Sequence, residues 1–129
     1  MQLKLCYKSY DFKMSLGAMK QFKESTGKDL WFSLLNFLEV WSLSDGEPTL
    51  TRMKKVYEVL DFDTAAKLFH ALIKAENKSI PLEEIEDAMF KVGWLPSERE
   101  DNMSHPWPLV LVTTAHDINN QFSEDVKKK

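Results

Sequence analysis

The segment 30–43 constrains the fold more than any other part of the chain, because a helix built from it is apolar on nearly every side. At 100° per residue, one broad stripe is expected to face a core. This stripe comprises Leu30, Trp31, Leu34, Phe37, Leu38 and Trp41. Phe32, Leu35 and Leu43 point away from it. Such a helix must be covered on both sides, so either it is the central helix of the domain, or these three side chains contact a partner or a second copy of the chain.

Further helices are predicted on both sides of this segment by apolar residues at helical spacing. The first spans 16–26, with Ser15 as its N-cap and Gly27 at its end, and Asp29 caps the helix over 30–43. A third begins at 48–51, with the inward residues Met53, Val56, Tyr57 and Leu60. Asp63 is expected to cap a fourth, with the inner stripe Ala65, Leu68, Phe69, Leu72 and Ala75. Pro81 opens a fifth, with the core positions Leu82, Ile85, Met89 and Val92.

The two ends of the chain have different patterns. Period-two alternation over 3–7 and 10–16 predicts two short antiparallel strands within about 3–14, joined at Lys8 and Ser9. Residues 96–108 are a polar connection between prolines. Residues 109–112 are compatible with a buried strand, but a 3.6-residue period favours a helix over 109–122, with the inward residues Leu111, Ala115, Ile118 and Phe122. Residues 123–129 are charged and are expected to fray.

These elements predict a mainly α single domain over 1–129, in which a short N-terminal β-hairpin packs on a bundle of about five to six helices. A chain of 129 residues suits one domain with one core. Seventeen Lys and Arg against twenty Asp and Glu give a net charge of −3, which disfavours nucleic-acid binding because no basic face is implied.

Composition also bears on the compartment. The lone cysteine, Cys6, excludes an intramolecular disulfide, and we expect it to be a buried, unreactive thiol. The first residues contain no apolar core of a signal peptide, and no apolar run approaches the roughly 20 residues that span a bilayer. We therefore expect a cytoplasmic protein without membrane contact.

No motif in the chain predicts catalysis, a metal or a cofactor. His70, His105 and His116 lack ligand spacing and are expected to be solvated. Acidic residues on the fifth helix are expected on its solvent side, where paired carboxylates do no acid–base chemistry: Glu83, Glu84, Glu86 and Asp87. A phosphate loop, a nucleophile elbow and a Cys–His pair are all missing from the sequence. We expect a protein that is not an enzyme.

Two tryptophans flank the polar connection, Trp94 and Trp107. Large aromatic residues in such places are either anchors of a protein interface or residues that fasten a loop to the body. Both interpretations stay open at this point.

Residues 12–30 read FKMSLGAMKQFKESTGKDL. They contain, in this order, a β segment, a small residue leading into a helix, an acidic and aromatic stretch, and Thr-Gly before a second apolar helix. This order resembles the opening of the tail assembly chaperones of tailed bacteriophages, of the lambda type and the gene-transfer-agent type. Residues 79–86, SIPLEEIE, are similar to the Leu-Thr-Leu-Glu-Glu start of a helix in that family, with Pro81 in place of the capping Thr. The resemblance covers about residues 3–95.

The resemblance implies a non-catalytic assembly factor in the cytoplasm of an infected or lysogenic bacterium, absent from the mature virion. Such chaperones bind the long, helical tape measure protein and help to recruit tail tube subunits. The expected partner-binding residues are then Phe32, Leu35 and Leu43, together with Trp94 and Trp107. In this family a longer form often arises by a −1 ribosomal slip; the terminal lysines 127–129 fit either slippery codons or simple solubilising residues. The alternative function is a structural virion component, such as a helical head–tail connector subunit.

Overall fold

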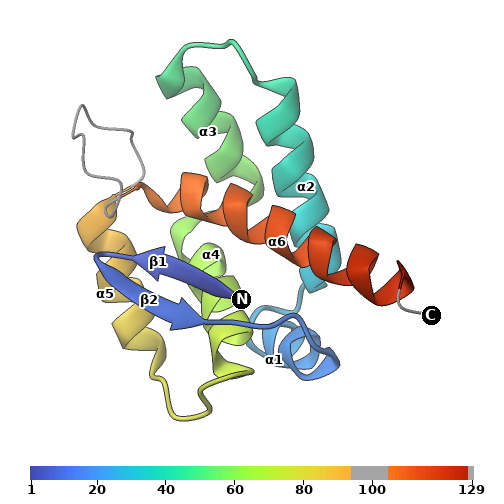
Figure 1. Ribbon diagram of the computed structural model, residues 1–129. Coiled ribbons are helices and arrows are strands. Elements are labelled where there is room, and N and C mark those ends of the chain that lie inside the picture. Colours follow the sequence, from blue (N-terminus) through green and yellow to red (C-terminus); the bar gives the residue numbers. More distant parts are fainter. Residues whose placement is uncertain (94–104, 128–129) are drawn as a thin grey trace.

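The computed structural model of the protein describes residues 1–93 and 105–127, with side chains as far as residue 122 (Figure 1). Its elements in chain order are β1 (Gln2–Leu5), β2 (Lys8–Asp11), α1 (Leu16–Thr26), α2 (Leu30–Leu43), α3 (Thr49–Val59), α4 (Phe62–Lys74), α5 (Leu82–Val92) and α6 (Trp107–Lys127). The predicted fold class, an N-terminal β-hairpin on a bundle of helices, is confirmed.

Helix α4 is the central helix of the fold. Most of its side chains are buried on all sides, among them Ala65, Leu68, Phe69 and Leu72. Helices α1 and α5 pack against it, and the backbone N–H of Lys13 donates to the carbonyl of Leu72 at 3.1 Å. One interpretation of residues 30–43 made them the central helix of the domain; that helix is α4 instead.

The N-cap of α4 is Asp61 and not Asp63, as the sequence predicted. The Asp61 carboxylate accepts a hydrogen bond from the N–H of Thr64 at 2.9 Å, which satisfies one of the free donors of the first turn. Asp63 lies within the first turn, where its charge suits the positive end of the helix. Phe62 begins the helix because its partly buried ring packs on the core, so the cap lies one residue before it.

The hairpin turns at Cys6 and Tyr7, so the turn predicted at Lys8 and Ser9 is wrong. Both turn residues have positive φ, 51° and 68°, which matches the right-handed twist of the strands in a two-residue hairpin loop. The resulting register places Leu3 opposite Tyr10, and both side chains are buried. Cys6 is partly buried. The register thus brings one face of the hairpin onto the core.

Helix α6 begins at Trp107, earlier than the predicted residue 109, and the strand alternative for 109–112 is wrong. Pro108 suits the first turn of a helix, where a backbone N–H would have no partner. The N–H of Trp107 donates to the carbonyl of Gly93 at 3.1 Å, which joins the start of α6 to the end of α5. Leu111, Ala115 and Ile118 are buried as predicted, and α6 packs along β1. The region predicted to fray extends the helix as far as Lys127.

Candidate protein-binding surface

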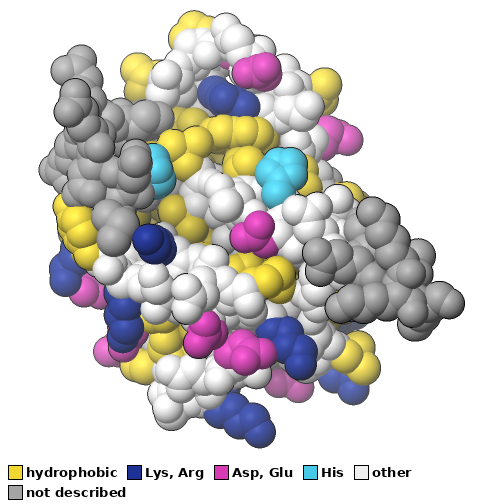
Figure 2. Space-filling model, in the orientation of Figure 1, with side chains coloured by type: hydrophobic (Ala, Val, Ile, Leu, Met, Phe, Trp, Pro, Cys, Tyr) yellow, Lys and Arg dark blue, Asp and Glu magenta, His cyan; other side chains and the backbone are white. Residues whose placement is uncertain are grey.

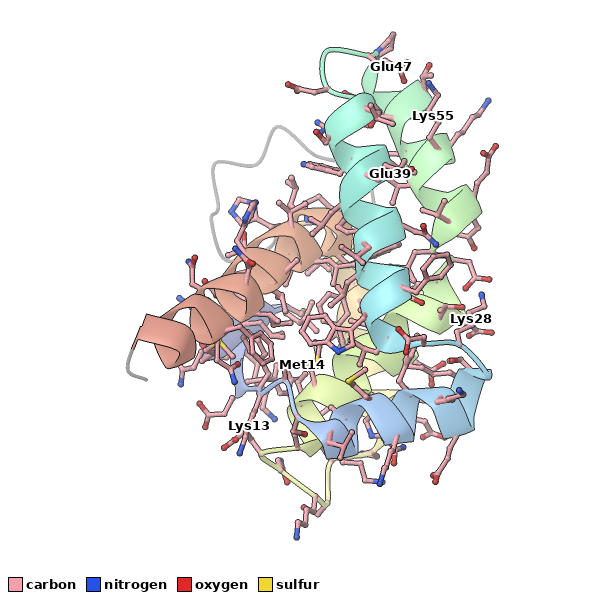
Figure 3. The ribbon with its side chains drawn as sticks, turned by 90° about the vertical axis from the view of Figure 1, so that its right-hand side faces the viewer. Lys13, Met14, Lys28, Glu39, Glu47 and Lys55 are labelled. Carbon is pink, nitrogen blue, oxygen red and sulfur yellow. The ribbon has the colours of Figure 1, made fainter. Side chains whose placement is uncertain are left out.

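Helices α2 and α3 form a helical hairpin that extends away from α1 (Figures 1 and 3). Its inner side is fixed to the body by Leu30, Leu34 and Phe37 of α2, which are all buried. Helix α3 packs chiefly on α2 and buries only Met53 and Val56 within its own length. The outer sides of both helices therefore face away from the core.

Apolar side chains occupy this outer side of α2. Phe32 is 64% exposed, Leu35 62% and Leu43 78%, so all three lie outside the core. The interpretation in which they contact a partner or a second copy of the chain requires this exposure. Phe32 and Leu35 are three residues apart and share a helix face, whereas Leu43 is about 12 Å further along at 1.5 Å per residue. The exposed Glu39 lies between them (Figure 3). We call the surface of Phe32, Leu35 and Leu43 the α2 outer face.

The α2–α3 hairpin carries a disproportionate share of exposed apolar area. Six of the eleven exposed large hydrophobic residues in the described part of the chain lie on it: Trp31, Phe32, Leu35, Leu43, Leu50 and Tyr57. The sequence analysis missed Leu50 and placed Tyr57 inside. Tyr57 is half exposed because α3 lies at the edge of the fold. Several exposed apolar side chains on one hairpin are the kind of surface that interaction sites of soluble proteins present.

Aromatic contact connects α2 to α6. The rings of Trp31 and Phe122 lie with their centroids 5.2 Å apart at an angle of 49°, a tilted arrangement that aromatic pairs favour. Both residues were predicted to be inward, but both are exposed beyond a third of their surface. They lie at the border of the core, next to the α2 outer face.

The far end of the hairpin is held by Arg52, a residue the sequence analysis did not single out. Its guanidinium lies 3.6 Å from the centroid of the Trp41 ring, and its Nη2 donates to the Trp41 carbonyl at 2.6 Å. Its Nε donates to the hydroxyl of Ser44 at 3.2 Å. The ammonium of Lys55, on α3, lies 2.6 Å from the carboxylate of Glu47 in the loop between α2 and α3 (Figure 3). The last carbonyls of a helix lack intrahelical donors and carry the negative end of the helix dipole. The Arg52 cation therefore stabilises this end of α2.

Trp107 does not lie at an exposed anchor position. It is only 2% exposed and belongs to the core at the start of α6, so it presents no surface to a partner. Burial corresponds to the other interpretation, in which the ring fastens the end of the connection to the body. Trp94 lies outside the described residues.

Two side chains that were predicted to be solvated, those of His70 and Glu84, have partners within the protein. The His70 Nε2 lies 2.8 Å from the carbonyl of Ile80, because the loop before α5 folds back over α4. The Glu84 carboxylate lies 3.0 Å from the Lys8 ammonium of the hairpin. Hydrogen bonds from Lys8 and Tyr10 lower the pKa of Glu84, and burial together with the Glu84 contact raises the pKa of the Tyr10 phenol. These groups join the hairpin and α4 to α5 and its preceding loop.

Within residues 1–93 and 105–127, no cluster of three or more His, Cys, Asp or Glu side chains is placed to hold a metal ion. None of the helices in this described part is both long enough and apolar enough to cross a bilayer. Comparisons with protein-family models, with curated proteins and with solved structures found no match.

Proposed function

We propose that this protein binds another polypeptide through the α2 outer face and acts as a non-catalytic tail assembly chaperone of a phage or prophage. The observation that carries the proposal is the exposure of Phe32 and Leu35 side by side on a helix whose opposite face is fixed in the core. The resemblance of residues 12–30 and 79–86 to tail assembly chaperones supports the choice of partner, the tape measure protein.

The partner segment in this proposal is an amphipathic helix. Exposed apolar residues at helical spacing bind such a helix by burying its apolar stripe against their own. Full burial of a side chain such as Phe or Leu contributes roughly 1.5–3 kcal/mol. Three such side chains, less the cost of association, give a weak single contact. Many copies along a long helical partner would still cover it, and each copy could be released as tail tube subunits arrive.

The proposed cellular place follows from this role. The protein would act in the cytoplasm of the bacterial host, where tails assemble, and would leave before the particle is complete. Its exposed apolar surface would be covered by the tape measure protein, or by a second copy of the chain, during that time.

Co-expression with the tape measure protein of the same genome tests the proposal. The wild-type protein should keep the tape measure protein soluble and co-purify with it. The double variant Phe32→Asp/Leu35→Asp should lose both effects while it retains the helical circular dichroism of the wild type. The matched control is Leu16→Asp/Phe90→Asp, because both residues are exposed apolar positions on other helices.

Two results would count against the proposal. A tape measure protein that stays insoluble beside the wild-type protein would remove its basis. Detection of the protein in purified phage particles would instead favour the alternative, a structural component such as a head–tail connector subunit.

A further inference from the structure

The α2 outer face carries a single charge at its centre. Glu39 is the one charged residue among the fourteen of this helix, and its side chain is exposed (Figure 3). Leu35, Glu39 and Leu43 are four residues apart and form one row along the helix, with about 6 Å between neighbouring positions. A helix that covers both leucines must therefore also cover the Glu39 carboxylate.

The Glu39 carboxylate has no counterion in the described part of the chain, where no ion pair or hydrogen bond engages it. Trp41 lies about 160° further around the helix axis, so Arg52, which stacks on that ring, is on the opposite side of α2. The hydrophobic hollow between the hairpin and α6 in Figure 2 is on that opposite side as well, because Trp41 lines it. Lys55 of α3 is already paired with Glu47. The charge at the centre of the α2 outer face is therefore not neutralised within the protein.

A second copy of the chain fits this face less well than a basic partner does. Helix α2 contains no Lys or Arg, so a second α2 laid along the row offers Glu39 no cation. The nearby Lys28 acts on Asp61 at the start of α4, whose pKa is lowered first by hydrogen bonds from Thr64 and also by this ammonium. The counterion of Glu39 is therefore expected to come from a different polypeptide.

We infer that the segment bound by the α2 outer face is an amphipathic helix with a Lys or Arg inside its apolar stripe, placed to pair with Glu39. The inference rests on the proposed function, that this face binds another polypeptide, and adds the chemistry of the bound segment. Apolar side chains three or four residues before and after the cation would pack on Leu35 and Leu43. A guanidinium suits this role best, since its planar fork binds a carboxylate through two hydrogen bonds.

The central carboxylate makes the face selective. A carboxylate that loses its water without gaining a cation opposes binding. A helix with an apolar residue or a carboxylate opposite Glu39 would therefore bind more weakly than one with a cation there, although its other contacts are the same. A wholly apolar face would bind apolar helices of any kind. Glu39 thus restricts the α2 outer face to one class of segment.

Two synthetic amphipathic peptides test the inference by fluorescence anisotropy. They share one Leu and Phe stripe and one polar face, and they differ only in a Lys or a Glu at the centre of the stripe. The wild-type protein should bind the Lys peptide at least about tenfold more tightly than the Glu peptide. Glu39→Lys should reverse this preference, and Glu39→Gln should reduce it to less than about threefold.

Glu58→Lys is the matched control, because Glu58 is an exposed carboxylate on α3 and the variant changes the net charge by the same amount as Glu39→Lys. It should keep the wild-type preference, whereas Phe32→Asp/Leu35→Asp should bind neither peptide. Each variant should retain the helical circular dichroism of the wild type, because the replaced side chains are exposed.

Equal affinity of the wild type for the two peptides, binding of neither, or an unchanged preference in Glu39→Lys would each overturn the inference. A wild-type dimer in sedimentation velocity that Lys28→Glu dissociates would assign the Glu39 carboxylate to a second copy and overturn it as well. If Glu39→Lys captures the tape measure protein as the wild type does while Phe32→Asp/Leu35→Asp does not, the inference fails and the proposed function stands. A wild-type protein that prefers the Lys peptide but never captures the tape measure protein would support the inference and remove that choice of partner.

Discussion

The guanidinium of Arg52 stacks 3.6 Å from the centroid of the Trp41 ring and also donates a hydrogen bond of 2.6 Å to the Trp41 carbonyl. One side chain of α3 thereby contacts both the ring and the backbone near the end of α2. Trp41 in turn stacks on Phe37, which is buried in the core, at 6.1 Å between centroids. The far end of the α2–α3 hairpin is thus joined to the core by one chain of contacts.

Replacement of Arg52 should loosen the end of the hairpin. We expect Arg52→Ala to lower the free energy of unfolding by about 1–2 kcal/mol, because it removes a cation–π contact and charge-assisted hydrogen bonds. Arg52→Lys should recover only part of this loss, since an ammonium lacks the planar fork. Urea unfolding measures the loss, and amide hydrogen exchange should locate it to the end of α2.

Lys54→Ala serves as the control for Arg52, because Lys54 is an exposed cation on the same helix. Its effect should stay within about 0.5 kcal/mol. An Arg52→Ala variant as stable as Lys54→Ala would show that the contact with Trp41 does not hold the hairpin together.

The local signals of the sequence predicted the first two helices well. Ser15 accepts a hydrogen bond from the N–H of Ala18 at 3.1 Å, Asp29 accepts one from Phe32 at 2.9 Å, and Gly27 ends α1 with a φ of +75°. Caps act within one helical turn, so neighbouring residues are enough to identify them. The bounds of α1 and α2 agree with the prediction for this reason.

The errors concern features that depend on distant parts of the chain. Either pair of residues could have formed the turn of the hairpin, and only packing of Leu3 and Tyr10 on the core selects Cys6 and Tyr7. The partner of His70 is a carbonyl ten residues away, which no local pattern predicts. The apolar periodicity of 30–43 likewise did not decide between a central helix and one with an exposed face. That choice depended on α4 taking the central place.

The two faces of α2 should respond differently to truncation of a phenylalanine. Phe37 is fully buried, so Phe37→Ala should lower the free energy of unfolding by about 3–5 kcal/mol through lost burial and a cavity. Phe32→Ala should change it by no more than about 0.5 kcal/mol, because the ring already faces solvent. Thermal and urea unfolding of both variants compare the same chemical change on one helix. A large loss for Phe32→Ala would place that ring in the core and remove it from the α2 outer face.

The cap of α4 should make stability depend on pH at the acid end. Hydrogen bonds from Thr64, first of all from its backbone N–H, lower the pKa of Asp61 below its usual 3.8. A carboxyl whose pKa is lower in the folded state stabilises the fold fully above its unfolded pKa, and this contribution is lost as pH falls through the folded pKa. We therefore expect the stability that Asp61 supplies at neutral pH to decline below about pH 4.

Three variants separate the cap from the charge. Asp61→Ala should cost about 1 kcal/mol at pH 7, because a free N–H of the first turn loses its acceptor. Asp61→Asn keeps an acceptor that does not titrate, so its deficit relative to the wild type should shrink as pH falls from 5 toward 2, about the range in which a lowered carboxyl titrates. Asp63→Ala, two residues further along, should cost less than Asp61→Ala, since the side chain of Asp63 is not the N-cap. Urea unfolding across this pH range measures the free energy of unfolding of all three variants. A larger loss for Asp63→Ala than for Asp61→Ala would identify Asp63 as the N-cap, as the sequence predicted.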